Sequence, residues 1–280
     1  MSLLEAILLG IIQGLTEFLP ISSTAHLTLA GQLLGLIDPT KPQQWTAFIA
    51  IIQLGTAIAV IVYFYHDLFG MTKNVLTDVR TPSTQRTWSY ESKLFGKIIL
   101  GTIPVVVLGL TFKKIIEGTF TKEISTFATA LIVLALILLW SEKVGKRNRT
   151  EHQTTWKDAF MVGIAQALAL IPGSSRSGTT ITAGLFLGLT RDAAARFSFL
   201  LSIPAVLASG LYELYSMRYQ ITEVGTAQVV VATIVSGVVG YLSIAFLLKY
   251  LRTHTTFIFI YYRTTLGIAL WVFYLFGFLA

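Results

Sequence analysis

The chain carries GIIQGLTEFLPISSTAH at residues 10–26 and GIAQALALIPGSSRSGTT at residues 163–180. Both stretches read as an apolar helix, a proline, two serines and a second apolar helix. Proline interrupts a helix, and a serine hydroxyl can cap the helix that follows. The first copy supplies a carboxylate and an imidazole, whereas the second supplies a guanidinium. We therefore predict one site built between two related halves of the chain.

Composition assigns the chain to the integral membrane class. Apolar residues make up 54% of its 280 residues, only 12% are charged, and the mean hydropathy is +0.71. A soluble protein could bury one long apolar helix, but here nearly every segment would have to be buried at once. Cysteine is absent, which excludes disulfides and thiolate metal sites. The net charge of +7 lies mostly in loops, so it indicates membrane orientation rather than nucleic-acid binding.

The apolar segments beside each break are too short to cross a bilayer, which takes about 20 residues. Each pair should therefore enter and leave the membrane on one side. We expect an all-α integral membrane protein with about six transmembrane helices plus two re-entrant helix–break–helix pairs, arranged as an inverted-topology repeat. The expected parts are a first repeat at 1–141 with its pair at 3–37, a basic cytoplasmic loop at 142–157, and a second repeat at 158–280 with its pair at 158–190.

The basic residues predict the orientation, because Lys and Arg gather in cytoplasmic loops. The loops around residues 73–93 and 143–157 hold many of them. Placing these loops inside puts both termini and the first broken pair on the outer side. The second broken pair then enters from the cytoplasm. Lys113 and Lys114 count against this orientation, because they fall in a loop left outside.

Glu17 is the first candidate site residue. A carboxylate in the middle of a spanning helix costs roughly 2.5–3.5 kcal/mol on insertion scales, so it indicates function by default. Gln13 lies four residues earlier and shares its helical face. The alternative is a Glu17 at a helix end in the headgroup region.

Ser22, Ser23 and Thr24 follow Pro20, and His26 lies three residues after Ser23 on the same helical face. A hydroxyl beside an imidazole is typical of an activated nucleophile or a proton relay. Helix capping is the alternative for at least one serine, and a structural role is the alternative for the histidine.

The segment from Pro172 to Thr180 has the composition of a phosphate cradle. It combines small residues, hydroxyl donors, a helix start and one arginine, and a helix start attracts anions. A guanidinium binds phosphate oxygens in pairs and stays charged. The alternative is a capped break with an arginine that reaches toward water. The candidate phosphate ligands are Arg176, Ser174, Ser175, Ser177 and Thr180.

Glu17 beside phosphate would be repulsive unless it is protonated, acts as a base or shares a cation. Mg²⁺ or Ca²⁺ bound by Glu17 and substrate oxygens would remove the repulsion. The chain shows too few ligands for a site made of protein alone.

These residues resemble the bacterial undecaprenyl-pyrophosphate phosphatase family of the bacitracin-resistance type. Gln13 to Glu17 match its (Glu/Gln)-x-x-x-Glu motif, and residues 172–180 match its Pro-Gly-x-Ser-Arg-Ser-x-x-Thr motif. The resemblance extends over essentially the whole chain, with Gln13 where many relatives have a second Glu. It implies a multi-pass protein of the bacterial inner membrane, with a homodimer as one possible assembly. It also implies a divalent cation, Mg²⁺ or Ca²⁺, and a site open to the outer face.

The implied reaction is hydrolysis of a C55 polyprenyl diphosphate to the monophosphate and phosphate, which recycles the lipid carrier of peptidoglycan synthesis. Catalysis is assigned to Glu17, Ser23, His26 and Arg176. Substrate binding is assigned to Gln13, Ser22, Thr24, Ser174, Ser175, Ser177 and Thr180. The nucleophile is left open between Ser23, Ser22, His26 and an activated water. The competing hypothesis is a transporter or lipid flippase, because broken helices in inverted repeats are typical of secondary transporters.

Overall fold

The computed structural model describes residues 1–280 except 39, 83–86, 113–122, 217–224 and 278–280. The described residues are helical apart from loops and one isolated bridge between Arg149 and Leu189, and they contain no strand. The helices are α1 (Leu3–Phe18), α2 (Ser23–Leu33), α3 (Pro42–Tyr63), α4 (Tyr65–Arg80), α5 (Tyr90–Thr111), α7 (Ile124–Val144), η2 (Glu151–Gln153), α8 (Trp156–Ala167), η3 (Leu168–Leu170), α9 (Arg176–Phe186), α10 (Arg191–Ser216), α12 (Thr226–Leu251) and α13 (Phe257–Leu275). The predicted all-α class is confirmed.

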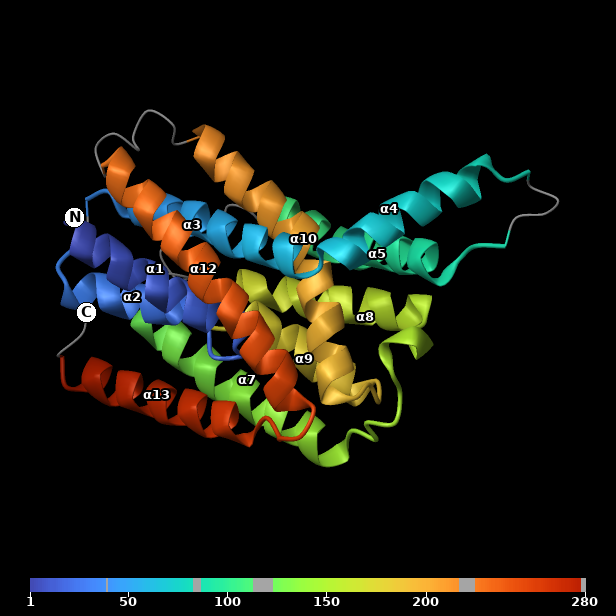
Figure 1. Ribbon diagram of the computed structural model, residues 1–280. Helices are drawn as coiled ribbons and strands as arrows, with labels where there is room; N and C mark the ends of the chain where they lie inside the picture. Colours follow the sequence, from blue (N-terminus) through green and yellow to red (C-terminus); the bar gives the residue numbers. More distant parts are fainter. Residues whose placement is uncertain (39, 83–86, 113–122, 217–224, 278–280) are drawn as a thin grey trace.

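Six of the described helices are long and apolar enough to cross a bilayer, namely α3, α5, α7, α10, α12 and α13. They form one bundle together with the shorter helices α1, α2, α8 and α9 (Figure 1). The chain is thus a multi-pass membrane protein, and the prediction of about six transmembrane helices is confirmed.

The two predicted breaks lie between α1 and α2 and between η3 and α9. Ser22 caps α2 by accepting a hydrogen bond from the N–H of Ala25 at 3.4 Å, and Ser175 caps α9 by accepting one from Gly178 at 3.2 Å. Both serines have a left-handed backbone, with φ of 75° and 65°. This conformation costs a residue other than glycine about 1–3 kcal/mol, so it persists only where its surroundings enforce it.

The strongest helix pairings join the two halves of the chain. α1 packs on α12 and α8 on α5, while α3 packs on α10 and α7 on α13. Small residues allow the close approaches, as is usual between helices in membranes. A Cβ on Gly10 would lie 2.6 Å from the carbonyl oxygen of Ala232, and one on Gly163 would lie 2.2 Å from that of Gly101. The two halves therefore form one core around the breaks.

The sequence analysis did not predict α4. This helix buries Met71 while Phe69 and Leu76 stay exposed, and polar residues separate its apolar ones. It therefore has no continuous apolar run that composition could reveal. In Figure 1, α4 and the start of α5 extend away from the bundle. Lys113 and Lys114, which counted against the predicted orientation, lie outside the described residues.

Candidate active site

The two breaks meet at a buried ion pair. Glu17 lies in the last turn of α1, and Arg176 is the first residue of α9, 159 residues later. Arg176 Nη2 donates to Glu17 Oε1 at 2.5 Å, and the side chains are 13% and 5% exposed. Removing one partner of such a pair leaves an uncompensated buried charge. The tertiary structure thus joins the carboxylate of one segment to the guanidinium of the other.

The second carboxylate oxygen of Glu17 accepts two further hydrogen bonds. Ser23 Oγ donates to Glu17 Oε2 at 2.7 Å, and Gln13 Nε2 donates to the same oxygen at 3.0 Å. Gln13 Nε2 also reaches Thr56 Oγ1 at 3.5 Å. A hydroxyl that donates to a buried carboxylate is arranged for activation by a general base. Glu17 thus accepts the hydrogen bond of the Ser23 hydroxyl as well as that of Arg176.

His26 contacts a different partner from the one expected. Its Nδ1 lies 2.7 Å from the carbonyl oxygen of Ser22, and its Nε2 lies 2.7 Å from the hydroxyl of Tyr262. A carbonyl only accepts hydrogen bonds, so Nδ1 carries a proton, and in the neutral ring Nε2 then accepts from the Tyr262 hydroxyl. The two rings also stack, with centroids 5.5 Å apart. The structure therefore does not bring His26 to Ser23, because the serine hydroxyl is already donated to Glu17.

The serine and threonine hydroxyls of the second break mostly bond within the protein. Ser175 is the cap of α9, and Ser177 Oγ donates across to the carbonyl oxygen of Leu19 at 3.1 Å. Thr180 Oγ1 donates to the carbonyl oxygen of Arg176 at 2.7 Å and pairs with Ser198 Oγ at 2.5 Å. These bonds fix the start of α9 beneath the ion pair.

Two buried polar atoms of this segment have no hydrogen-bond partner among the described residues, namely Ser174 Oγ and Arg176 Nη1. Buried polar groups in native proteins are nearly always paired, so such atoms indicate a ligand or water. The first N–H groups of α9 have no intrahelical partner either, as at every helix start. An anion is the ligand that a guanidinium and a helix start would bind.

Ser22 and Thr24 occupy the flanks of this site. Ser22 is buried and acts as the cap of α2, whereas Thr24 is half-buried in the first turn. In the described structure neither side chain hydrogen-bonds to Glu17 or Arg176. The structure therefore places both residues beside Ser23 rather than on the ion pair.

The residues at the ion pair offer a divalent cation few ligands. The described chain contains no cluster of three His, Asp or Glu side chains that could hold a metal. Gln13 Oε1 is nevertheless buried without a partner beside Glu17. An amide oxygen and a carboxylate oxygen suit Mg²⁺ or Ca²⁺ when water and phosphate complete the shell. The site fits a cation that is shared with a phosphate ligand.

The sequence analysis missed two neighbouring residues of α13 that contact the breaks. Tyr262 bonds to His26, and Arg263 bonds to backbone carbonyls of both breaks. Arg263 is the only charged residue of α13. An ionisable residue inside a spanning helix is itself a functional signal, and that signal would have identified Arg263.

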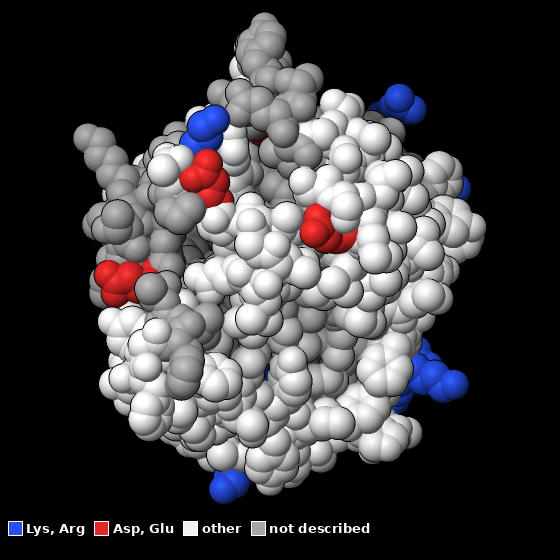
Figure 2. All heavy atoms as spheres, turned by 90° about the vertical axis from the view of Figure 1, so that its left-hand side faces the viewer, with Lys and Arg blue, Asp and Glu red and all other residues white. Residues whose placement is uncertain are grey.

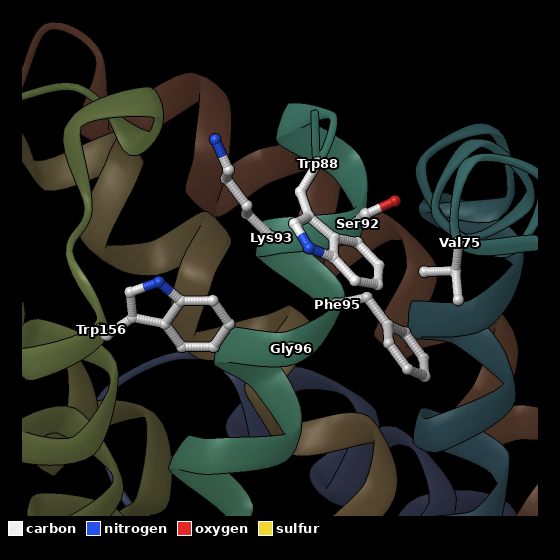
Figure 3. A pocket seen from close by; sticks show the side chains of 7 residues that line it. All are labelled: Val75, Trp88, Ser92, Lys93, Phe95, Gly96 and Trp156. Atoms are coloured by element: carbon white, nitrogen blue, oxygen red, sulfur yellow. The ribbon is translucent and has the colours of Figure 1, made fainter. Parts of the chain in front are cut away.

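A separate pocket lies between α4, α5 and α8 (Figure 3). Trp88 and Trp156 project into it from opposite sides, with Lys93 between them. Its walls are largely apolar, and none of its lining residues belongs to the predicted site. The ion pair at the breaks therefore remains the candidate active site.

Together, the fold and the site define a multi-pass helical membrane protein in which two helix breaks meet at a buried ion pair with a serine hydroxyl bonded to it. The family model described as "Bacitracin resistance protein BacA" matches residues 6–269. A relative from Syntrophobacter fumaroxidans named "Undecaprenyl-diphosphatase" is 52% identical over 274 residues, 96% of each chain. Relatives of the same name from Chloroherpeton thalassium and Chlorobium phaeobacteroides are each 50% identical, again over 96% of both chains. The chain belongs to the BacA family, which confirms the resemblance drawn from the two motifs.

Proposed function

We propose that this chain hydrolyses undecaprenyl diphosphate to undecaprenyl phosphate and inorganic phosphate, which recycles the lipid carrier of peptidoglycan synthesis. Relatives that share half of its residues over 96% of both chains are named for this phosphatase activity. The observation that carries the proposal is Glu17, which accepts hydrogen bonds from Ser23 and Arg176 together. A carrier that only binds an anion has no use for a hydroxyl held by a buried carboxylate.

The first chemical step is attack by Ser23 Oγ on the terminal phosphorus while Glu17 takes the hydroxyl proton. The bond from phosphorus to the bridging oxygen breaks, and the lipid monophosphate leaves. Glu17 passes this proton to the departing lipid monophosphate and becomes a base again. Water then attacks the phosphoserine, and Glu17 takes a proton from the water and returns it to Ser23 Oγ as inorganic phosphate departs. General base catalysis of this kind contributes about 10²–10⁴ in rate. Both His26 nitrogens are already bonded, which favours the serine over the imidazole as nucleophile.

Arg176 supplies the anion clamp. When the diphosphate arrives, the guanidinium shifts from Glu17 toward the phosphate oxygens, with the unpaired Nη1 and Ser174 Oγ available to them. The charge that builds up as the bond breaks is then stabilised by Arg176 and the start of α9. The same shift leaves Glu17 free to act as a base.

Glu17 and the amide oxygen of Gln13, together with the substrate, would hold a divalent cation, Mg²⁺ or Ca²⁺. Its chemistry there is to neutralise phosphate charge. This assignment rests on the unpaired Gln13 Oε1 beside the carboxylate.

The two broken pairs are re-entrant and belong to repeats of opposite orientation, with the site open to the outer face. The pairing of α1 with α12 and of α8 with α5 supports this arrangement, because each broken pair packs on the other half. Figure 2 shows the end of the molecule that carries both termini. Among the described residues that this view draws, the Lys and Arg side chains lie mainly at the margin of the face. Few basic side chains are expected on the outer side.

The test is phosphate release from undecaprenyl diphosphate by purified protein in detergent. Wild type is compared with Arg176→Ala and Glu17→Ala, each with and without a chelator. Turnover by wild type and its loss in both variants would support the phosphatase with one site between the halves. A folded wild type that binds the lipid without releasing phosphate, even with Mg²⁺ or Ca²⁺ supplied, would favour the transporter instead.

A further inference from the structure

Arg263, in the middle of α13, has the largest fully buried side chain of the described structure. Its guanidinium donates to the carbonyl oxygen of Ser174 at 2.9 Å and to those of Pro20 and Gly173 at 3.4 Å. Pro20 belongs to the first break, and Gly173 and Ser174 belong to the second. One cation therefore bonds to the backbone of both breaks.

The partners of Arg263 are unusual for a buried arginine. Within the described residues its guanidinium has no carboxylate partner, and its Nε is buried without a hydrogen-bond partner. Burying a charge that is not paired costs several kcal/mol, so such a residue is kept only where it does something a neutral side chain cannot. Among the described residues, its hydrogen-bond partners are the carbonyls of the two breaks.

The guanidinium of Arg263 lies against Gly178, where a residue with a side chain would not leave room for it. A Cβ on Gly178 would lie 2.7 Å from Arg263 Nη1, so a larger residue would displace the guanidinium. Gly178 is two residues after Arg176, in the first turn of α9. The start of α9 therefore rests directly on Arg263.

We infer that Arg263 is a positioning residue that fixes the two breaks relative to each other and so sets the geometry of Glu17, Ser23 and Arg176. This inference rests on the proposed phosphatase function. Arg263 itself faces carbonyls rather than the ion pair, so it is not expected to contact the substrate. A displacement of about 1 Å between reacting groups can cost about 10² in rate, which is the scale expected for its loss.

The experiment compares Arg263→Met, Arg263→Lys and Gly178→Ala with wild type in phosphate release. Tyr261→Phe, on the exposed side of the same helix, is the matched control. Thermal unfolding and size-exclusion profiles verify that each variant is folded. We expect Arg263→Met to lower kcat by about 100-fold with KM within about threefold of wild type, and Gly178→Ala to lower kcat in the same way. Lysine keeps the charge and should restore part of the rate.

A double-mutant comparison separates positioning from general damage. If Arg263 acts through the ion pair, Arg263→Met added to Arg176→Ala should lose no more than about threefold beyond Arg176→Ala alone. Losses that multiply would overturn the inference, as would wild-type turnover by Arg263→Met. A raised KM with unchanged kcat would instead make Arg263 a substrate ligand. A wild type that releases no phosphate would contradict the proposed function, which is a different outcome from all of these.

Discussion

The two broken segments have similar backbone conformations but carry different reactive side chains. α2 and α9 are each 11 residues long, and each begins after a serine cap in the left-handed region. Ser23 and Arg176 are the first residues of these two helices, so the reactive hydroxyl and the guanidinium occupy equivalent positions. Both bond to Glu17. Matching scaffolds thus direct unlike side chains at one carboxylate.

The difference between the segments is greatest in the helix before each break. Six residues before Ser23 stands Glu17, whereas six residues before Arg176 stands Leu170. Gln13 and Gln166 are also equivalent, and both are fully buried. Gln13 bonds to Glu17, while both side-chain polar atoms of Gln166 lack a partner among the described residues. The comparison teaches that the second copy keeps the shape of the site but has no acid or base of its own.

The largest effect is expected for Ser23→Ala, which removes the proposed nucleophile. We predict a loss of at least about 10³ in kcat, because without the Ser23 hydroxyl no phosphoserine can form and Glu17 has no hydroxyl to deprotonate. Phosphate release measures this loss, and a trapped phosphoserine in wild type would identify the residue. Ser125→Ala, an unrelated hydroxyl at the start of α7, serves as control. Activity that persists in Ser23→Ala would rule out the serine route.

The equivalent position in the second segment should respond differently. Arg176→Ala is expected to lower kcat by about 10²–10³, the usual cost of one stabilising donor. Arg176→Lys should recover only part of this rate, since an ammonium lacks the paired geometry of a guanidinium. Steady-state kinetics on both variants provide the measurement. Equal activity of Lys and wild type would show that charge alone is needed.

Gln13 and Gln166, the equivalent glutamines, give the sharpest test of whether only the first segment carries the acid–base chemistry. Gln13→Met should lower kcat by about tenfold, because it removes a hydrogen bond to a charged group worth about 1.5–3 kcal/mol. Gln166→Met should leave kcat unchanged and raise the free energy of unfolding by about 1–2 kcal/mol, since an unpaired buried amide is replaced. Steady-state kinetics and thermal unfolding of the two variants would measure both effects. Loss of activity in Gln166→Met would assign a functional ligand to the second copy.

The smallest expected effects concern the scaffold that the segments share. Gly10→Ala and Gly163→Ala should each lower the free energy of unfolding by about 1–3 kcal/mol, because a Cβ would meet the backbone of the facing helix. Thermal unfolding in detergent gives the comparison. Gly70→Ala is the control, because a Cβ there would lie 4.0 Å from its nearest neighbour, Glu91 Cγ. Similar losses in the first two would support equivalent halves, whereas a loss in only one would argue against them.

Several features of this fold could be predicted from sequence because they depend on local chemistry. The six spanning helices follow from runs of apolar residues, and the breaks follow from Pro20 and Pro172. The residue-by-residue alignment of the two copies does not follow from the motifs, because alignment on the prolines pairs Ser22 with Ser174. The structure pairs Ser22 with Ser175, since these two residues are the helix caps. A cap is defined by backbone torsions, which a motif does not contain.

The sequence by itself determined the membrane class, the two broken helices and the residues from which a phosphate site could be built. Only the tertiary structure decided which of them meet. It joined Glu17 to Ser23 and Arg176, turned His26 toward Tyr262 and placed Arg263 beneath both breaks. The physical reason is that apolar runs and helix breaks act over a few residues. Contacts between residues 159 positions apart depend instead on how the helices of the two halves pack.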